Sequence, residues 1–185
     1  MKSSRRAFVT ALAVGICTLL APSLSGATAA ESAETAMQTP LEGPYLIVSG
    51  HSERRCLDAD VDTLWYNGGV VHLWGCTPHS DNQWWYFQAV EGQSDVYYIV
   101  NARSGKLLDA DLNTIGNNGS VVHLWERVDG NTNQWWRMIE TGGTKVIQNV
   151  RSGQVLDADL GAIGRDGTRV QLWVRLDGAN QKWEA

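Results

Sequence analysis

The tetrapeptide Leu57-Asp58-Ala59-Asp60 occurs three times, at residues 57–60, 108–111 and 156–159. Each copy is followed by a second motif, His-Leu-Trp or Gln-Leu-Trp, at residues 72–74, 123–125 and 171–173. A third motif, Asn-Gln-Trp-Trp or Asn-Gln-Lys-Trp, occupies residues 82–85, 133–136 and 180–183. The step from the first aspartate to the Leu-Trp tryptophan is 16 residues in every copy (58 to 74, 109 to 125, 157 to 173). Motifs in a fixed order and at a fixed spacing indicate an internal threefold repeat.

Within the repeats, short β-branched and aromatic runs are bounded by turn residues, a pattern typical of strands. The clearest runs are residues 45–49, 70–74, 84–90, 97–100, 120–125 and 135–139. Tight turns are indicated at Asn67-Gly68, Asn118-Gly119 and Asp166-Gly167. No segment shows a sustained helical period with capping signals. We therefore expect an all-β domain of about twelve strands, in three pseudo-equivalent four-stranded lobes that share one core.

The first thirty residues are typical of a secretory signal peptide. Residues 1–6 are basic, residues 7–21 are apolar, and Ala27-Thr28-Ala29 offers a cleavage site. The apolar run is short for a membrane span. Residues 4–9, with their adjacent Arg5 and Arg6, resemble a twin-arginine signal, so the general and the twin-arginine export routes both stay open. Residues 1–30 are accordingly predicted to direct bacterial export, which gives a secreted protein.

The rest of the chain fits one domain. Residues 31–44 are acidic, small and interrupted by proline, and we expect a disordered linker there. The folded domain is expected at 45–185, with lobes at about 45–95, 96–144 and 145–185. No later segment is apolar for long enough to span a membrane.

Charge argues against two classes of partner. The chain has 15 basic and 20 acidic residues, a net charge of −5. Residues 1–30 hold Lys2, Arg5 and Arg6 and no acid, so their removal leaves 12 basic residues against 20 acidic ones, a net charge of −8. A domain of this sign repels phosphate backbones and anionic lipid surfaces. Nucleic acid is therefore not expected as a partner, nor is an anionic membrane surface.

Two cysteines remain after the signal peptide. In an exported protein, a disulfide between Cys56 and Cys76 is the default interpretation. Closing a loop of this length contributes about 3 kcal/mol in the chain-entropy model. A metal site is the poorer alternative, because neither cysteine has a thiol or histidine nearby at zinc spacing.

Taken together, the aspartate, the Leu-Trp strand and the Gln-x-Trp element resemble the ricin-type β-trefoil lectin domain over residues 45–185. The resemblance implies a β-trefoil in which each lobe holds a shallow sugar site. The aspartate would accept hydrogen bonds from vicinal hydroxyls, the tryptophan would stack on the sugar, and the asparagine would add a polar contact. The implied carbohydrate-binding residues are Asp58, His72, Trp74 and Asn82; Asp109, His123, Trp125 and Asn133; and Asp157, Gln171, Trp173 and Asn180.

The same resemblance implies a structural role for the Gln-x-Trp residues, which are Gln83, Trp85, Gln134, Trp136, Gln181 and Trp183. It also matches Cys56 and Cys76 to a disulfide usual within a lobe. This sequence departs from the family pattern in three ways. The loop before the Leu-Trp strand is one residue longer, His72 and His123 stand where many members have glutamine, and the third repeat is one residue shorter before Asn180.

The chemistry of the repeated residues supports sugar binding independently. A carboxylate can accept two vicinal hydroxyls, an asparagine side chain both donates and accepts, and an indole covers the apolar face of a sugar ring. The chain has nine tryptophans, all after residue 60. This distribution indicates that indole in particular, rather than aromatic bulk, is required.

Metal binding and catalysis are the alternatives that the aspartates raise. Asp58, Asp60 and Asp62 alternate, but an EF-hand would need glycine and glutamate where Thr63 and Gly69 stand, so no metal is expected. Paired carboxylates can hydrolyse glycosides. Here the pair recurs in all three repeats, as a binding motif does and a single active centre does not. Neither an enzyme nor a cofactor is expected.

The sequence therefore predicts a secreted, monomeric lectin that binds glycans through up to three sites. Galactoside-like and xylan-like ligands both remain open. The alternative is a protein-binding trefoil, a protease inhibitor or a toxin-associated partner, that uses the lobes as a scaffold. Two further roles are also open: whether Asp60, Asp111 and Asp159 contact ligand or cap a turn, and whether Trp65 and Tyr66 extend the first site.

Overall fold

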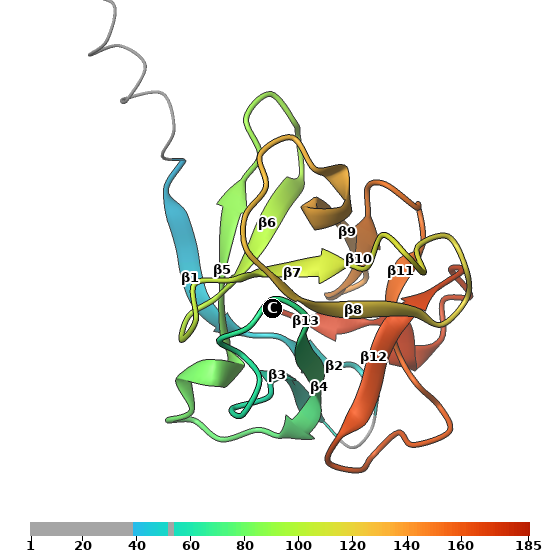
Figure 1. Cartoon of the computed structure of the whole chain (residues 1–185). Coiled ribbons are helices and arrows are strands. Elements are labelled where there is room, and N and C mark those ends of the chain that lie inside the picture. The colour runs from blue at the N-terminus through green and yellow to red at the C-terminus, as the bar shows by residue number, and fades with distance from the viewer. Residues whose placement is uncertain (1–38, 52–53) are drawn as a thin grey trace, which may run out of the picture. The chain divides into compact units, whose positions relative to one another are not determined.

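The computed structural model describes residues 39–51 and 54–185, so the predicted signal peptide and most of the predicted linker lie outside the described residues. The described part contains thirteen strands, three short 3₁₀ turns and no α-helix (Figure 1). The strands are β1 (Leu41–Leu46), β2 (Val48–Ser49), β3 (Arg55–Ala59), β4 (Gly69–Gly75), β5 (Trp84–Ala89), β6 (Val96–Asn101), β7 (Leu107–Ala110), β8 (Ser120–Trp125), β9 (Trp136–Thr141), β10 (Thr144–Asn149), β11 (Val155–Ala158), β12 (Thr168–Trp173) and β13 (Trp183–Glu184). The 3₁₀ turns are Asp81–Gln83, Thr132–Gln134 and Ala179–Gln181. The expected all-β class is confirmed.

Seven of the strands form a ring that closes on itself. β1 pairs with β5, β5 with β6, β6 with β9, β9 with β10, β10 with β13, and β13 with β2, all antiparallel. β1 and β2 are separated by a single residue, Ile47, and so act as one interrupted strand. This interruption explains why the structure has thirteen strands where the sequence predicts about twelve.

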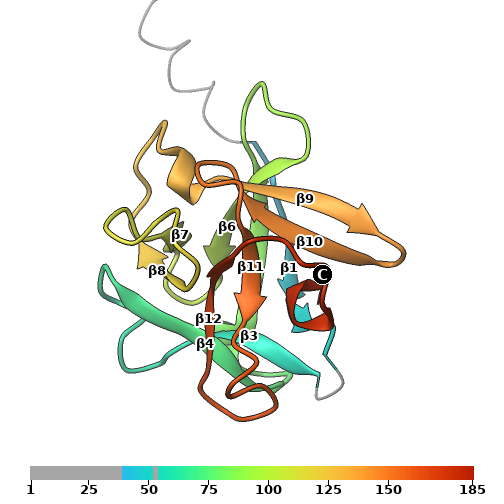
Figure 2. The same cartoon turned by 90° about the vertical axis from the view of Figure 1, so that its right-hand side faces the viewer.

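The remaining six strands form three hairpins, β3–β4, β7–β8 and β11–β12. The second strands of the hairpins also pair with one another, because β4 contacts β8, β8 contacts β12, and β12 contacts β4 (Figure 2). The predicted turns make these junctions. The backbone N–H groups of Gly68, Gly119 and Gly167 each donate to a carbonyl of the next hairpin at 2.8 Å. All three glycines have a positive φ of 81–85°, which only glycine adopts without strain.

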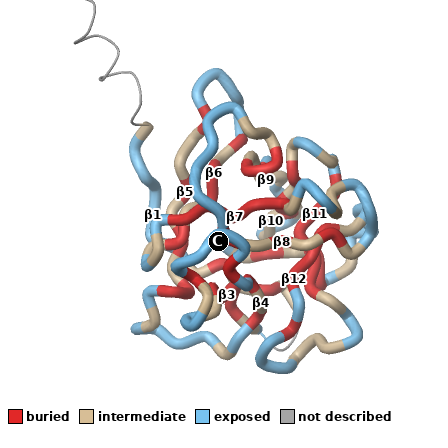
Figure 3. Tube along the Cα trace, viewed as in Figure 1, coloured by how far each residue is buried: buried red, intermediate tan, exposed pale blue. Residues whose placement is uncertain are grey.

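The larger of two hydrophobic clusters among the described residues lies inside the ring and beneath the hairpins, where Figure 3 shows buried backbone. The Gln-x-Trp tryptophans, Trp85, Trp136 and Trp183, are fully buried in it. Each indole also donates Nε1–H to a backbone carbonyl in its own repeat, at 2.9–3.1 Å. A buried indole that satisfies its one donor gains its apolar burial without leaving a polar group unpaired. The predicted structural role of these tryptophans is consistent with this environment.

The predicted start of the domain at residue 45 is four residues too late. Residues 41–44, assigned from sequence to the disordered linker, belong to β1, where Leu41 lies opposite Gln88 and Glu42 opposite Phe87. Gly43-Pro44 looks like punctuation in the sequence. In the structure, it shifts the register of pairing between Glu42 and Tyr45 rather than ending the strand. A proline is tolerated at such an irregularity because no ladder hydrogen bond is needed from its nitrogen.

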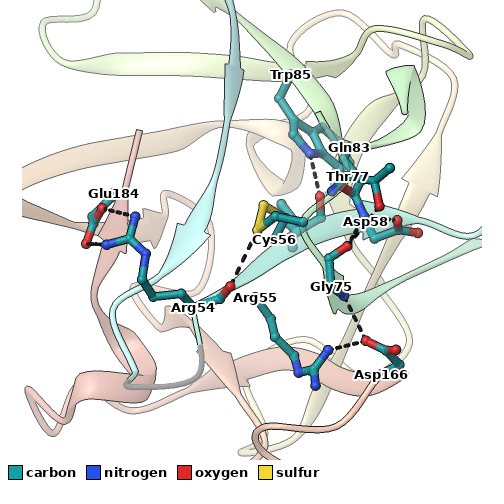
Figure 4. Close-up of a disulfide and its surroundings, with 12 residues drawn as sticks. Arg54, Arg55, Cys56, Asp58, Gly75, Thr77, Gln83, Trp85, Asp166 and Glu184 are labelled. Atoms are coloured by element: carbon teal, nitrogen blue, oxygen red, sulfur yellow. Dashed lines mark hydrogen bonds and ion pairs between the residues drawn. A yellow bond between two sulfur atoms is a disulfide. The ribbon is translucent and has the colours of Figure 1, made fainter. Parts of the chain in front are cut away.

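The predicted disulfide between Cys56 and Cys76 is present, with an S–S distance of 2.03 Å (Figure 4). It ties β3 to the residue that follows β4. Two arginines beside it bind acids from the third repeat: Arg55 pairs with Asp166, and Arg54 pairs with Glu184 at 3.0 Å. The first repeat is thus fixed within itself by the disulfide and to the third repeat by ion pairs.

Candidate functional site

Asp58 lies at the centre of a hydrogen-bonded group in the first repeat. Its side chain projects from β3 and is only 6% exposed. Oδ2 accepts hydrogen bonds from Asn82 Nδ2 at 2.9 Å and from Gln83 Nε2 at 2.8 Å. Oδ1 lies 3.1 Å from His72 Nε2, on the adjoining strand β4. Three residues from outside β3 therefore hold one carboxylate in a fixed orientation.

The second and third repeats reproduce this arrangement. Asp109 binds His123, Asn133 and Gln134 at 3.0, 2.9 and 2.9 Å. Asp157 binds Gln171, Asn180 and Gln181 at 3.2, 2.8 and 2.9 Å. The predicted aspartate, asparagine and histidine or glutamine are thus brought together in all three repeats. The shorter third repeat retains the full set of contacts.

An indole lies beside each carboxylate group. Trp74 and Trp125 lie at or next to the ends of β4 and β8 with 43% and 37% of their surface exposed, and Trp173 is half-buried. The His72 ring lies against Trp74 with centroids 5.3 Å apart, and His123 lies against Trp125 at 5.2 Å. Each histidine therefore connects the buried acid to the exposed ring. In the third repeat, Gln171 makes the contact to the acid without a ring.

The predicted residues of each repeat line one hollow of the surface. The three hollows have volumes of about 260, 280 and 310 Å³. Asp58, His72, Trp74 and Asn82 line the first, Asp109, His123, Trp125 and Asn133 the second, and Asp157, Gln171, Trp173 and Asn180 the third. All twelve candidates from the sequence therefore lie at a hollow.

The rims of the hollows were not identified from the sequence, and they differ. The first hollow is edged by Thr77 and Ser80, and the third by the strongly exposed Leu160 and Leu176. The residue after each Asp-x-Asp motif also lines its hollow, as Val61, Leu112 or Leu160. That position is the one sequence signal that could have located the rim. A ligand group over the third hollow meets a more apolar edge than one over the first.

The second aspartate of each motif caps the turn that follows it. Asp60 Oδ1 accepts hydrogen bonds from the backbone N–H groups of Asp62 and Thr63, both at 3.1 Å, and from the Thr63 hydroxyl at 3.0 Å. Burial acts to raise the pKa of Asp111, but hydrogen bonds from Asn113 and Thr114 outweigh it, so the pKa lies below its ordinary value. These carboxylates also line the hollows. Within the described residues, no group of three or more acidic, histidine or cysteine side chains is arranged to hold a metal ion.

The Gln-x-Trp glutamines do more than the structural role that the resemblance implies. Gln83 donates to the site acid Asp58, donates to the Gly75 carbonyl at 3.0 Å, and accepts from the Thr77 backbone N–H at 2.8 Å (Figure 4). Gln134 and Gln181 make the corresponding contacts. The glutamine of each repeat therefore fixes the rim segment and the aspartate carboxylate of the hollow together.

Trp65 and Tyr66 do not line the first hollow. Both are exposed, and their loop is fastened to the second repeat instead. Gly68 donates to the Leu124 carbonyl at 2.8 Å, and Asn67 Oδ1 accepts from the Glu126 backbone N–H at 2.9 Å. The possibility that these aromatic residues extend the first site is therefore not supported by the contacts of their loop.

Comparisons with known proteins agree with this architecture. The family model described as ricin-type beta-trefoil lectin domain-like matches residues 81–173 and 132–185, more than half of the chain. No curated protein matches the chain in sequence. Among solved structures, a designed 3-fold symmetric protein, ThreeFoil, is 29% identical with a TM-score of 0.67, covering 76% of this chain and 95% of its own.

Two natural proteins contain a similar domain. An exo-beta-1,3-galactanase from Clostridium thermocellum is 26% identical, with a TM-score of 0.68 over 80% of this chain. A Polyporus squamosus lectin, solved with the epitope Neu5Aca2-6Galb1-4GlcNAc, is 20% identical with a TM-score of 0.65 over 76% of this chain. The match spans only 30% and 47% of those two proteins. On the strength of the family match, the chain belongs to the ricin-type β-trefoil lectin domain-like family.

Proposed function

We propose that this protein is a lectin whose three hollows are sugar sites, one in each of three four-stranded lobes of a β-trefoil. The observation that carries the proposal is the threefold recurrence of one arrangement, a buried carboxylate held by amide donors beside a partly exposed indole. A scaffold that only needed to fold would have no reason to keep Trp74 and Trp125 at the surface next to these acids, because exposed indoles lose their apolar burial.

The geometry supports a specific division of roles. Each carboxylate oxygen has two lone pairs. In the first repeat, Asn82 and Gln83 occupy those of Asp58 Oδ2, so acceptor capacity for a sugar hydroxyl remains on Oδ1, whose one protein partner is His72. Because Asn82, Gln83 and His72 hold Asp58 in place, little side-chain freedom is lost when a sugar binds. The indole then covers the apolar C–H face of the ring. These are binding roles, and the proposal includes no reaction.

Export and a monomeric state belong to the same proposal. They rest on the signal-like residues 1–30 and on a domain that closes its own sheet. No helix among the described residues is long and apolar enough to cross a membrane.

The direct test is a glycan array with the purified domain, on which galactosides and xylan-type polymers are both displayed. Galactosides are the first ligand class to test, because one of the similar structures is an exo-beta-1,3-galactanase. We expect concentration-dependent binding to at least one glycan class, with stronger retention on polymeric than on monomeric ligands because three linked sites act together. If no glycan on the array bound and the protein inhibited a protease in a panel, the protein-binding function would be supported instead of the lectin function.

The third site is expected to lose affinity as the pH falls. Burial raises the pKa of Asp157 above its ordinary value, although hydrogen bonds from Gln181, Gln171 and Asn180 act against it; the carboxylate of Asp159 raises it further. Protonation removes an acceptor for the sugar hydroxyls, so binding is present above this pKa and is lost as the pH decreases through it. The measurement is affinity between about pH 7 and pH 3, in a Trp74→Ala/Trp125→Ala background that leaves only the third site.

The control for this titration is Asp159→Asn in the same background. Asparagine can still accept the turn hydrogen bond from the Gly161 backbone N–H, but it carries no charge. The midpoint of the pH dependence should therefore move to lower pH. Affinity that does not change with pH would show that Asp157 is not a sugar ligand.

A further inference from the structure

A fourth hollow lies at one mouth of the strand ring, and it shares no residue with the three candidate sugar sites. Its volume is about 270 Å³. β1, β5, β6, β9 and β10 all contribute side chains to it, and β1, β9 and β10 are seen together in Figure 2. Neither the repeat motifs nor the family match assigns a role to this end of the ring.

The walls of this mouth hollow are aromatic. Tyr45 and Phe87 lie stacked with ring centroids 5.8 Å apart, and Phe87 meets the edge of Tyr97 at 6.0 Å. Met138 adds a partly buried thioether at the same hollow. Three rings in contact form a rigid surface, whose π faces attract a cation and whose carbon area packs against alkyl groups.

The rim of the mouth hollow carries unbalanced negative charge. Glu42, Asp95 and Glu140 line it, against a single Lys145 whose Nζ lies 3.3 Å from Glu140 Oε1. Within residues 39–51 and 54–185, the carboxylates of Glu42 and Asp95 have no hydrogen-bond or ion-pair partner. Tyr97 responds to this environment. Burial raises the pKa of its hydroxyl, and the negative charges of Glu42 and Asp95 raise that pKa further.

The chemistry of the hollow limits the classes of ligand that it can bind. A metal ion does not fit, because no three acidic, histidine or cysteine side chains of the described chain are gathered closely enough to chelate one. An anion would be repelled. A neutral sugar would gain no Coulombic attraction from the carboxylates of Glu42 and Asp95. A cation with carbon substituents satisfies both the aromatic walls and the acidic rim.

We propose that the mouth hollow binds an organic ammonium ion, with its alkyl groups against Tyr45, Phe87 and Tyr97 and its charge facing Glu42 and Asp95. This binding is separate from the proposed sugar binding and does not depend on it. The same chemistry occurs in a small quaternary amine and in a lysine side chain, so the test includes both.

The test uses the full chain, titrated with choline and, in parallel, with 3,3-dimethylbutan-1-ol, its uncharged isostere, while the tyrosine resonances are followed by NMR. We expect saturable shifts with choline, at least tenfold weaker binding of the alcohol, and weaker choline binding as salt is raised. A titration with Nα-acetyl-lysine methylamide shows which of the two sources binds more tightly. Equal binding of choline and the alcohol would reduce the hollow to an apolar one and overturn the proposal, as would no saturation by either amine.

Two substitutions locate the binding. Tyr97→Leu should weaken choline binding by about 5- to 30-fold through the lost cation–π contact. Asp95→Asn should weaken it several-fold; asparagine tolerates the positive φ of 58° found there, so the fold is kept. The matched control is Tyr66→Leu, an exposed tyrosine outside the hollow, which should leave choline binding unchanged. The melting temperature reports folding of each variant, and choline binding that survives both hollow substitutions would overturn the proposal.

Discussion

Trp136→Ala is expected to lower the free energy of unfolding by about 3–5 kcal/mol, the range for removing a large aromatic side chain from a core. Trp136 is fully buried in the larger core cluster, and its Nε1–H donates to the Leu108 carbonyl at 2.9 Å. Alanine would leave a cavity and an unpaired buried carbonyl. Chemical denaturation followed by circular dichroism measures this loss, and a domain of this size has little stability beyond it.

The control is the same substitution eleven positions upstream, Trp125→Ala. This indole is partly exposed, and its ring contact among the described residues is with His123. Its removal should cost about 1 kcal/mol or less. The pair therefore separates the core tryptophans from the surface ones by stability alone. Equal losses in the two variants would contradict the assignment of Trp136 to the core and of Trp125 to the surface.

The equivalent burial of Trp85, Trp136 and Trp183 also explains why the repeats alone predict so much of the fold. A motif that recurs three times must serve the same environment three times, and no single repeat of this size can bury its own apolar face. The strand expected at 120–125 is the observed β8, Ser120–Trp125. Here the β-branched run and the preceding Asn118-Gly119 turn agree with the tertiary contacts.

Other parts of the fold depend on pairings that local sequence does not encode. β1 is held by its pairing with β5, between residues that are 38 to 47 positions apart in sequence, and this overrides the turn propensity of Gly43-Pro44. The interruption at Ile47 likewise reflects a change of partner, since β1 pairs with β5 whereas β2 pairs with β13 and β3. Such changes are set by closure of the ring.

The candidate sites also contain some residues that the repeats predict and others that they do not. Recurrence placed the aspartates, asparagines and Leu-Trp tryptophans correctly together, because each motif has one position in the repeat. Residues that vary between repeats, such as Thr77 in the first and Leu176 in the third, carry no recurrent signal. The mouth hollow is assembled from one or two residues on each of five strands, together with Asp95 and Ala185, which lie next to strands, so no stretch of sequence marks it.

Replacing Trp74, Trp125 and Trp173 together by alanine is expected to abolish glycan binding while leaving the fold intact. Each indole removed from a sugar face should cost about 1–2 kcal/mol, or about 5- to 30-fold in affinity at that site. On a surface that displays many ligands, the loss is larger, because linked sites that each bind weakly no longer reinforce one another. The affinity of each single variant for a soluble monovalent ligand, measured by calorimetry, gives the contribution of its site.

Trp65→Ala provides the matched control, because this tryptophan is 55% exposed yet lies outside all three hollows. If exposed indole merely made the surface adhesive, Trp65→Ala would weaken binding as much as a substitution in a hollow. If the carboxylate–indole arrangement is the site, Trp65→Ala should bind like the parent. The single variants then rank the hollows, and Trp173→Ala, beside the apolar Leu160 and Leu176, should change selectivity among sugars more than Trp74→Ala does. Undiminished glycan binding by a correctly folded triple variant would refute the sugar sites proposed at all three hollows.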